Sequence, residues 1–145
     1  MGINIMDFVF NPYDLKVNLN LGFAYENENQ LASAVSHYMR GAEYGLDSNY
    51  RNKKILISEC LIRTGECFFK LGSRLASTKS VILHALSNTP KLPQIYLTLS
   101  KVYEQQQEWG ECNAMCNIGI EMIDNYTRFQ YDNKDKETIL NNLLY

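Results

Sequence analysis

The stretch between residues 14 and 45 carries two different hydrophobic patterns. In its first half, apolar side chains alternate with polar ones, which is the period of a half-buried strand: Leu15, Val17, Leu19 and Leu21. In its second half, apolar and small side chains follow the helical period: Leu31, Ala34, Val35, Tyr38 and Ala42. The first half is ambiguous by itself, so the choice between strand and helix depends on the rest of the chain.

A similar order of residues recurs three times, as a small residue, an aromatic residue and then small or apolar partners. The first copy has Leu21-Gly22, Tyr25, Ala34, Tyr38 and Gly41-Ala42. The third copy has Leu99-Ser100, Tyr103, Cys112, Cys116 and Gly119 at the same offsets. The second copy has Thr64-Gly65, Phe68 and then, after one extra residue in the turn, Ile82 and Ala85. This register resembles the tetratricopeptide repeat, a helix–turn–helix unit of about 34 residues.

The small residues of this register have a physical role in a helical hairpin. Gly22, Gly65 and Ser100 are expected where the two helices cross most closely, with Ala34 and Cys112 in the facing position. The aromatic residues would fill the wider part of each interface. Helix is therefore preferred over strand for the first stretch, and its alternation is explained if that helix is covered on more than one side.

The predicted fold is an all-α, α-solenoid of about three such hairpins with a C-terminal capping helix, in a single domain over residues 1–145. Repeat 1 covers about 14–46, repeat 2 about 50–90, repeat 3 about 93–124, and the cap about 134–144. Helices are expected at about 14–26, 30–45, 50–71, 75–88, 93–105, 108–124 and 134–144. The connections between them are short, as antiparallel neighbours require.

Composition and charge exclude several classes of function. The 145 residues, 46% of them hydrophobic, are enough for one domain with its own core. A net charge of −2, with no basic run longer than Lys53-Lys54, argues against nucleic acid as a partner. No stretch has the roughly 20 apolar residues of a membrane span, and the start lacks the features of a signal peptide. A cytoplasmic location is expected, in the host cytoplasm or the virion if the chain is of phage origin.

A more specific resemblance is carried by "LGFAYENENQLASAVSHYMRGAEYG" and above all by "LHALSNTPKLPQIYLTLSKVYE". These segments are similar to the repeats that marine cyanobacteria and their phages attach to large glycosyltransferase polypeptides, over roughly residues 10–124. The resemblance implies an accessory module beside a sugar-transferring enzyme. The enzyme is missing, because 145 residues leave no room for a nucleotide-sugar domain and no Asp-x-Asp metal motif is present. We therefore predict no catalytic activity.

Two cysteines are the main candidates for metal chemistry. Cys112 and Cys116 lie four residues apart on one helical face, and a metal site would need further ligands such as Cys67 or His84. Because the two cysteines occupy the positions of Ala34 and Tyr38 in the first repeat, core packing is the preferred interpretation. No metal and no cofactor is predicted.

The histidines, glutamates and glycines also give little indication of a catalytic or phosphate-binding site. Neither His37 nor His84 has a Ser, Cys or Asp at a spacing typical of a nucleophile pair. Glu59 and Glu66 could share a helix face, but such pairs are common on solvated helices. The glycines are scattered at repeat offsets and form no phosphate-binding loop.

Stacked hairpins of this kind line a concave surface with the first helix of each pair, and such surfaces bind peptides or proteins. The predicted partner-binding groove consists of Lys16, Leu19, Phe23, Glu26, Glu59, Ile62, Arg63, Glu66, Phe69, Gln94, Leu97, Lys101 and Glu104. Some tetratricopeptide proteins clamp a carboxylate with polar residues at these places, whereas this chain has Leu19, Phe23 and Leu97. The expected partner is a protein or peptide of mixed charge.

Phe23 and Phe69 are open to two interpretations. They would anchor a bound polypeptide if they point into the groove, away from the partner helix that Tyr25 and Phe68 contact, or they are buried between successive repeats. The predicted function is accordingly a non-catalytic protein-interaction module, and the resemblance implies that it is an accessory to a glycosyltransferase system. The alternative is a structural or self-assembling subunit, for example of a phage particle.

Overall fold

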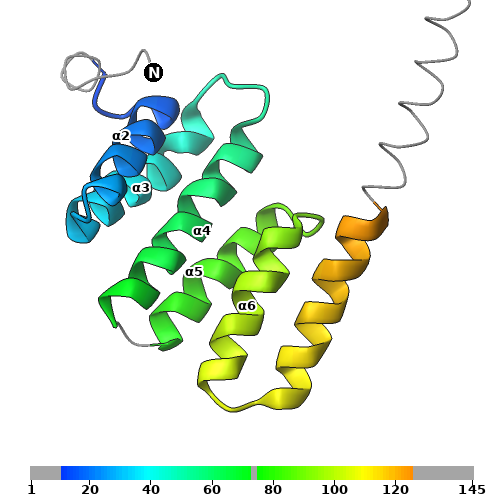
Figure 1. The fold of residues 1–145 in the computed structure, drawn as a ribbon. Helices are drawn as coiled ribbons and strands as arrows, with labels where there is room; N and C mark the ends of the chain where they lie inside the picture. Colours follow the sequence, from blue (N-terminus) through cyan, green and yellow to red (C-terminus); the bar gives the residue numbers. More distant parts are fainter. Residues whose placement is uncertain (1–10, 73–74, 126–145) are drawn as a thin grey trace, which may run out of the picture.

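A computed structural model describes residues 11–72 and 75–125, which form helices joined by short connections (Figure 1). The elements are α2 (Leu15–Asn27), α3 (Leu31–Tyr44), the short 3-10 helix η1 (Gly45–Asp47), α4 (Lys53–Leu71), α5 (Leu75–Asn88) and α6 (Pro93–Gln105). A last helix covers 109–125. Each of the six α-helices expected within the described residues is present, with ends that differ from the expected ones by at most three residues.

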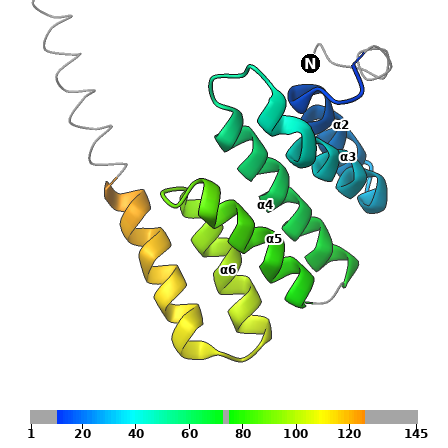
Figure 2. The same ribbon diagram turned by 180° about the vertical axis from the view of Figure 1, so that it is seen from behind.

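The helices stack in chain order as antiparallel pairs, as both faces of the molecule show (Figure 1 and Figure 2). Helix α4 contacts α2 and α3 of the preceding hairpin, its own partner α5, and α6 of the following hairpin. Each hairpin thus packs on its neighbours in the sequence, which is the arrangement of a helical solenoid. The predicted all-α solenoid is confirmed. Within the described residues, every helix is too short or too polar to cross a lipid bilayer.

Residues 15–21, whose pattern suits a strand or a helix, are helical because α2 is covered on more than one side. All four alternating apolar residues, Leu15, Val17, Leu19 and Leu21, are buried, since both α3 and α4 pack on α2. Asn18 is also fully buried, but its amide nitrogen donates to the carbonyl oxygens of Pro12 and Asp14. The Asp14 carboxylate caps the helix by accepting from the Val17 amide at 2.9 Å.

Gly22 and Gly65 lie where the helices of a hairpin approach most closely. A Cβ added to Gly22 would lie 2.3 Å from the Tyr38 ring, and one added to Gly65 would lie 2.6 Å from Ile82 Cδ1. The close crossing predicted at both glycines is therefore present. The facing residue differs from the expectation, because the side chain nearest Gly22 belongs to Tyr38, one helical turn after Ala34.

The turns inside the first and third hairpins have the same backbone conformation. Asn29 and Gln107, which lie 78 residues apart (29 to 107), both have a φ of 58°. The hydrogen bonds around them also repeat: Glu28 N to Ala24 O, Asn29 N to Glu26 O and Gln30 N to Tyr25 O match Gln106 N to Val102 O, Gln107 N to Glu104 O and Glu108 N to Tyr103 O. This equivalence supports the repeat register derived from the sequence.

The third hairpin departs from the first on its outer side. Cys112 and Cys116 are only half-buried, whereas the equivalent Ala34 and Tyr38 are fully buried. Core packing of the two cysteines is thus only partial, because the following helix α4 covers Tyr38 and the described residues contain no such helix after 109–125. The cap predicted at 134–144 lies outside the described residues.

Candidate partner-binding groove

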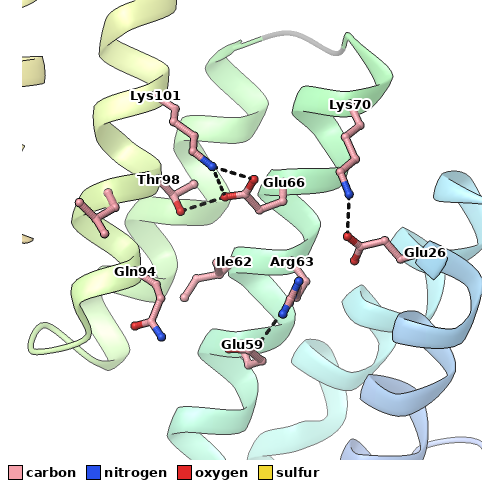
Figure 3. A pocket seen from close by; sticks show the side chains of 10 residues that line it. Glu26, Glu59, Ile62, Arg63, Glu66, Lys70, Gln94, Thr98 and Lys101 are labelled. Atoms are coloured by element: carbon pink, nitrogen blue, oxygen red, sulfur yellow. Dashed lines mark hydrogen bonds and ion pairs between the residues drawn. The ribbon is translucent and has the colours of Figure 1, made fainter. Parts of the chain in front are cut away.

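A groove runs along the seam between α4 and α6. Its middle part, the central pocket, has a volume of about 360 Å³ (Figure 3). The residues that line it are Glu26, Glu59, Ile62, Arg63, Glu66, Lys70, Gln94, Leu97, Thr98 and Lys101. Glu26 comes from α2, the next five residues from α4 and the last four from α6, so each of the three hairpins contributes to the pocket.

Two further hollows continue the groove at either end. Toward the carboxyl ends of α4 and α6, a hollow of about 520 Å³ shares Glu66, Lys70 and Lys101 with the central pocket; we call it the Phe69 pocket. Its other lining residues are Phe69, Gly72, Leu75, Glu104 and Gln105. At the opposite end, a hollow of about 650 Å³ shares Gln94 and Leu97; we call it the apolar pocket. It is completed by Ile55, Lys91, Leu92, Pro93, Met122 and Ile123.

Three ion pairs occupy the central pocket. Lys70 Nζ lies 2.9 Å from Glu26 Oε2, Lys101 Nζ lies 3.2 Å from Glu66 Oε1, and Arg63 Nε lies 3.1 Å from Glu59 Oε1 (Figure 3). The first two pairs join neighbouring hairpins, and the third lies within α4. With three acidic and three basic groups paired, the middle of the groove has no excess charge.

Glu26 is the most deeply held of these charges, with its side chain only 10% exposed. The Tyr38 hydroxyl donates to Glu26 Oε1 at 2.7 Å, and Lys70 donates to Oε2. Burial acts to raise the pKa of Glu26, but the hydrogen bonds from Tyr38 and Lys70 and the nearby positive charges outweigh it and lower the pKa. Burial and the bond to Glu26 raise the pKa of Tyr38. Glu26 is therefore a carboxylate whose negative charge is already paired within the protein, by Tyr38 and Lys70.

Of the two interpretations of Phe23, the one in which it points into the groove and away from the partner helix is wrong. Its ring packs edge-on against Tyr38 of α3, with the ring centres 5.8 Å apart. The Arg63 guanidinium lies over the Phe23 ring, 4.9 Å from its centre. Phe23 is half-buried in this way and stands behind Arg63, outside the lining of the groove.

Two other predicted residues also lie outside the groove lining. Leu19 is only 6% exposed because α2 is covered by its neighbours, so it belongs to the core and its predicted place on the concave surface is wrong. Lys16 is exposed, but its Nζ lies 4.8 Å over the ring of Tyr50, just before α4.

The structure brings most of the predicted groove residues together. The central pocket contains Glu26, Glu59, Ile62, Arg63, Glu66, Gln94, Leu97 and Lys101, and the Phe69 pocket contains Phe69 and Glu104. Lys70 and Thr98 were not predicted, although both continue the spacing of three or four residues that relates their neighbours on α4 and α6. The apolar pocket was not predicted either, because it depends on how the last helix packs on α6. Partner binding by these residues remains a prediction.

The nucleophilic and metal-binding side chains are poorly placed for chemistry. Burial raises the pKa of the Cys60 thiol to about 12 and that of Cys67 to about 11, so both are protonated at neutral pH. His37 Nδ1 lies 3.1 Å from Asn18 Oδ1, and burial together with the charge of Arg40 lowers its pKa. Within residues 11–72 and 75–125, no three His, Cys, Asp or Glu side chains cluster closely enough to hold a metal ion.

Comparison with known proteins finds similarity at the level of the fold. No protein-family model matches the chain, and no curated protein matches its sequence. Among solved structures, it is similar to "MamA MSR-1 C2", a tetratricopeptide-type helical repeat protein, with a TM-score of 0.64 and 19% sequence identity. That match covers 83% of this chain and 64% of the other. A second structure, "Crystal structure of MamA", has a TM-score of 0.43 and 14% identity over 83% of this chain and 85% of that one.

The first of these similarities establishes the class of fold. The chain is an all-α solenoid of hairpins similar to tetratricopeptide repeats, as its sequence predicted. At 19% identity the likeness concerns the fold alone, and the chain spans less than two thirds of that structure's length.

Proposed function

We propose that this chain is a non-catalytic protein-interaction module that binds a polypeptide segment of a partner along the groove between α4 and α6. The observation that carries the proposal is the continuity of the three hollows, which share Gln94 and Leu97 at one junction and Glu66, Lys70 and Lys101 at the other. A groove of this shape suits an extended chain better than a compact ligand. Repeat solenoids commonly use such concave surfaces for binding.

The charges of the groove favour a protein partner of mixed charge. Two of its ion pairs, Arg63–Glu59 and Lys101–Glu66, are partly exposed at both partners, and pairs of this kind stabilise a protein by only about 0–1 kcal/mol. A bound polypeptide can therefore replace one of them at small cost and offer its own charges instead. A phosphate backbone would need a clear excess of Lys and Arg, which the balanced groove does not offer.

The same contacts support binding over catalysis. Each acidic side chain of the central pocket is already paired with a base, and Glu66 also accepts a hydrogen bond from the Thr98 hydroxyl at 3.1 Å. A general acid or base needs a proton to exchange near neutral pH. Glu26, the most enclosed of the three, has its pKa lowered away from that range.

Selection from a random peptide library on the immobilised full chain tests this function. We expect peptides that bind and lose at least about fivefold in affinity with Lys101→Glu, because this change breaks the pair to Glu66 inside the groove. Arg51→Glu is the matched control, since Arg51 is exposed and outside the groove. No selected peptide, or peptides equally sensitive to both variants, would contradict the proposal.

A finer role, as an accessory to a glycosyltransferase of a cyanobacterial or cyanophage system, rests only on the sequence resemblance of residues 10–124. It predicts that the chain co-purifies with such an enzyme when the two are produced together, and that Lys101→Glu weakens this association. Co-purification that is absent, or that is unchanged by the variant, would remove this finer role without affecting peptide binding.

Self-assembly is a second candidate, favoured by the last helix. Trp109 and Ile120 are 59% and 53% exposed and lie on one helical face together with the half-buried Cys112 and Cys116. If this face joins copies of the chain, light scattering after size exclusion should show a dimer or larger species that Ile120→Asp returns to a monomer. A monomer at all concentrations would exclude this role.

A further inference from the structure

We infer that the groove binds its partner in one direction, with an acidic and apolar part of the partner at the apolar pocket and a basic residue about six positions away at the Phe69 pocket. This inference rests on the proposed function and specifies the chemistry of the partner. It follows from three features of the groove: the charges at its two ends, the apolar pocket, and the distance along α6.

The two ends of the groove carry opposite charges that the protein itself does not neutralise. In the central pocket all charged groups are in ion pairs. Lys91 lines the apolar pocket and Glu104 lines the Phe69 pocket, and within residues 11–72 and 75–125 neither makes an ion pair. A partner therefore gains new charge pairs at the ends only, with a carboxylate at Lys91 and a cation at Glu104.

The apolar pocket supplies an anchoring point next to Lys91. Leu92, Leu97 and Met122 are half-buried, and Ile123 is 42% exposed. Gly119 allows the last helix to come close to α6 here, since a Cβ at that position would lie 2.9 Å from Leu97 Cδ2. The volume of about 650 Å³ lies within the range of roughly 300–1,000 Å³ typical of ligand pockets. A large aliphatic or aromatic side chain of the partner would cover this exposed apolar surface. Removing such surface from water is the main driving force of association.

The length of α6 sets the spacing between the two parts of the partner. Glu104 lies in the last turn of α6, and Lys91 lies two residues before the first residue of the helix. The eleven steps from Pro93 to Glu104 (93 to 104) span about 17 Å at a helical rise of 1.5 Å per residue, and the residues before the helix bring the separation from Lys91 to about 20 Å. An extended polypeptide advances about 3.3 Å per residue, so about six residues connect the acidic and basic ends of the partner.

The test is the composition of the peptides selected on the full chain, together with two charge and polarity variants. We expect Asp or Glu beside Leu, Ile or Phe, with Lys or Arg about six positions away. Lys91→Glu should reduce the affinity of these peptides about tenfold and select a basic residue in place of the acidic one. Ile123→Asp should reduce it similarly, whereas the controls Arg51→Glu and Ile120→Asp, both outside the pocket, should leave it within twofold.

The other outcomes separate this inference from the proposed function. If peptides bind and respond to Lys101→Glu but not to Lys91→Glu or Ile123→Asp, the groove binds polypeptides and the directional inference is overturned. If no peptide binds, both the proposed function and this inference are contradicted. If peptides bind only after Leu143→Asp is introduced into the full chain, its own C-terminal segment fills the apolar pocket, which also overturns the inference. A dimer that Ile123→Asp dissociates, without peptide binding, would assign the pocket to a second copy and overturn it.

Discussion

Gly22 leaves no room for a side chain between α2 and α3. The nearest atoms belong to the ring of Tyr38, which is fully buried and held by its hydrogen bond to Glu26. We predict that Gly22→Ala destabilises the protein by about 1–3 kcal/mol through overpacking, although alanine is the better helix former. Gly110→Ala is the control, because nothing lies within 4 Å of a Cβ at that helical position. Denaturant unfolding measures both, and equal stability of the two variants would refute the crossing at Gly22.

Glu26 should make stability depend on pH below the ordinary range of a carboxyl group. Its pKa is lower in the folded protein than the reference value of 4.5, so its contribution is complete above about pH 4.5 and is lost as the pH falls through the folded value. We expect Glu26→Gln to cost on the order of 1 kcal/mol at neutral pH, and less as the pH drops below 4.5. A difference in unfolding free energy between wild type and variant that stays constant from pH 7 to pH 3 would contradict this.

At the scale of elements, the turns of the first and third hairpins share a left-handed residue. Gln107 adopts a φ of 58°, which is unfavourable for a residue with a Cβ, whereas Asn29 tolerates it better. We predict that Gln107→Gly raises the stability by up to about 1 kcal/mol and that Asn29→Gly changes it less. Thermal melting of the two variants checks the order, and destabilisation by Gln107→Gly would show that this turn is formed differently.

The sequence predicted the elements well because the repeat register depends on local spacing. Gly22 and Gly65 could be recognised as crossing points from their neighbours alone. The groove was predicted less well, because the same register does not tell how far the next hairpin covers a given helix. For this reason Leu19 is buried, and Phe23 is covered by Arg63. The apolar pocket is formed by the packing of the last helix on α6.

At the scale of the whole molecule, stability should decline from the first to the third hairpin. In a solenoid each repeat is stabilised mainly by its neighbours, and the outer face of helix 109–125 is less covered than that of α3. We predict faster amide hydrogen exchange in helix 109–125 than in α3 or α4 under native conditions. Equal protection along the chain would indicate that another part of the protein covers this face.

The central claim is that a partner polypeptide lies along the seam of α4 and α6. Chemical-shift mapping on the isotope-labelled full chain, titrated with a selected peptide, tests it most directly. We predict the largest changes at the amides of Arg63, Glu66, Gln94, Leu97 and Lys101, and also at Ile123, with little change in α3 or in the part of α5 that follows Leu75. Changes concentrated on α3 and α5, on the opposite side of the hairpins, would contradict it.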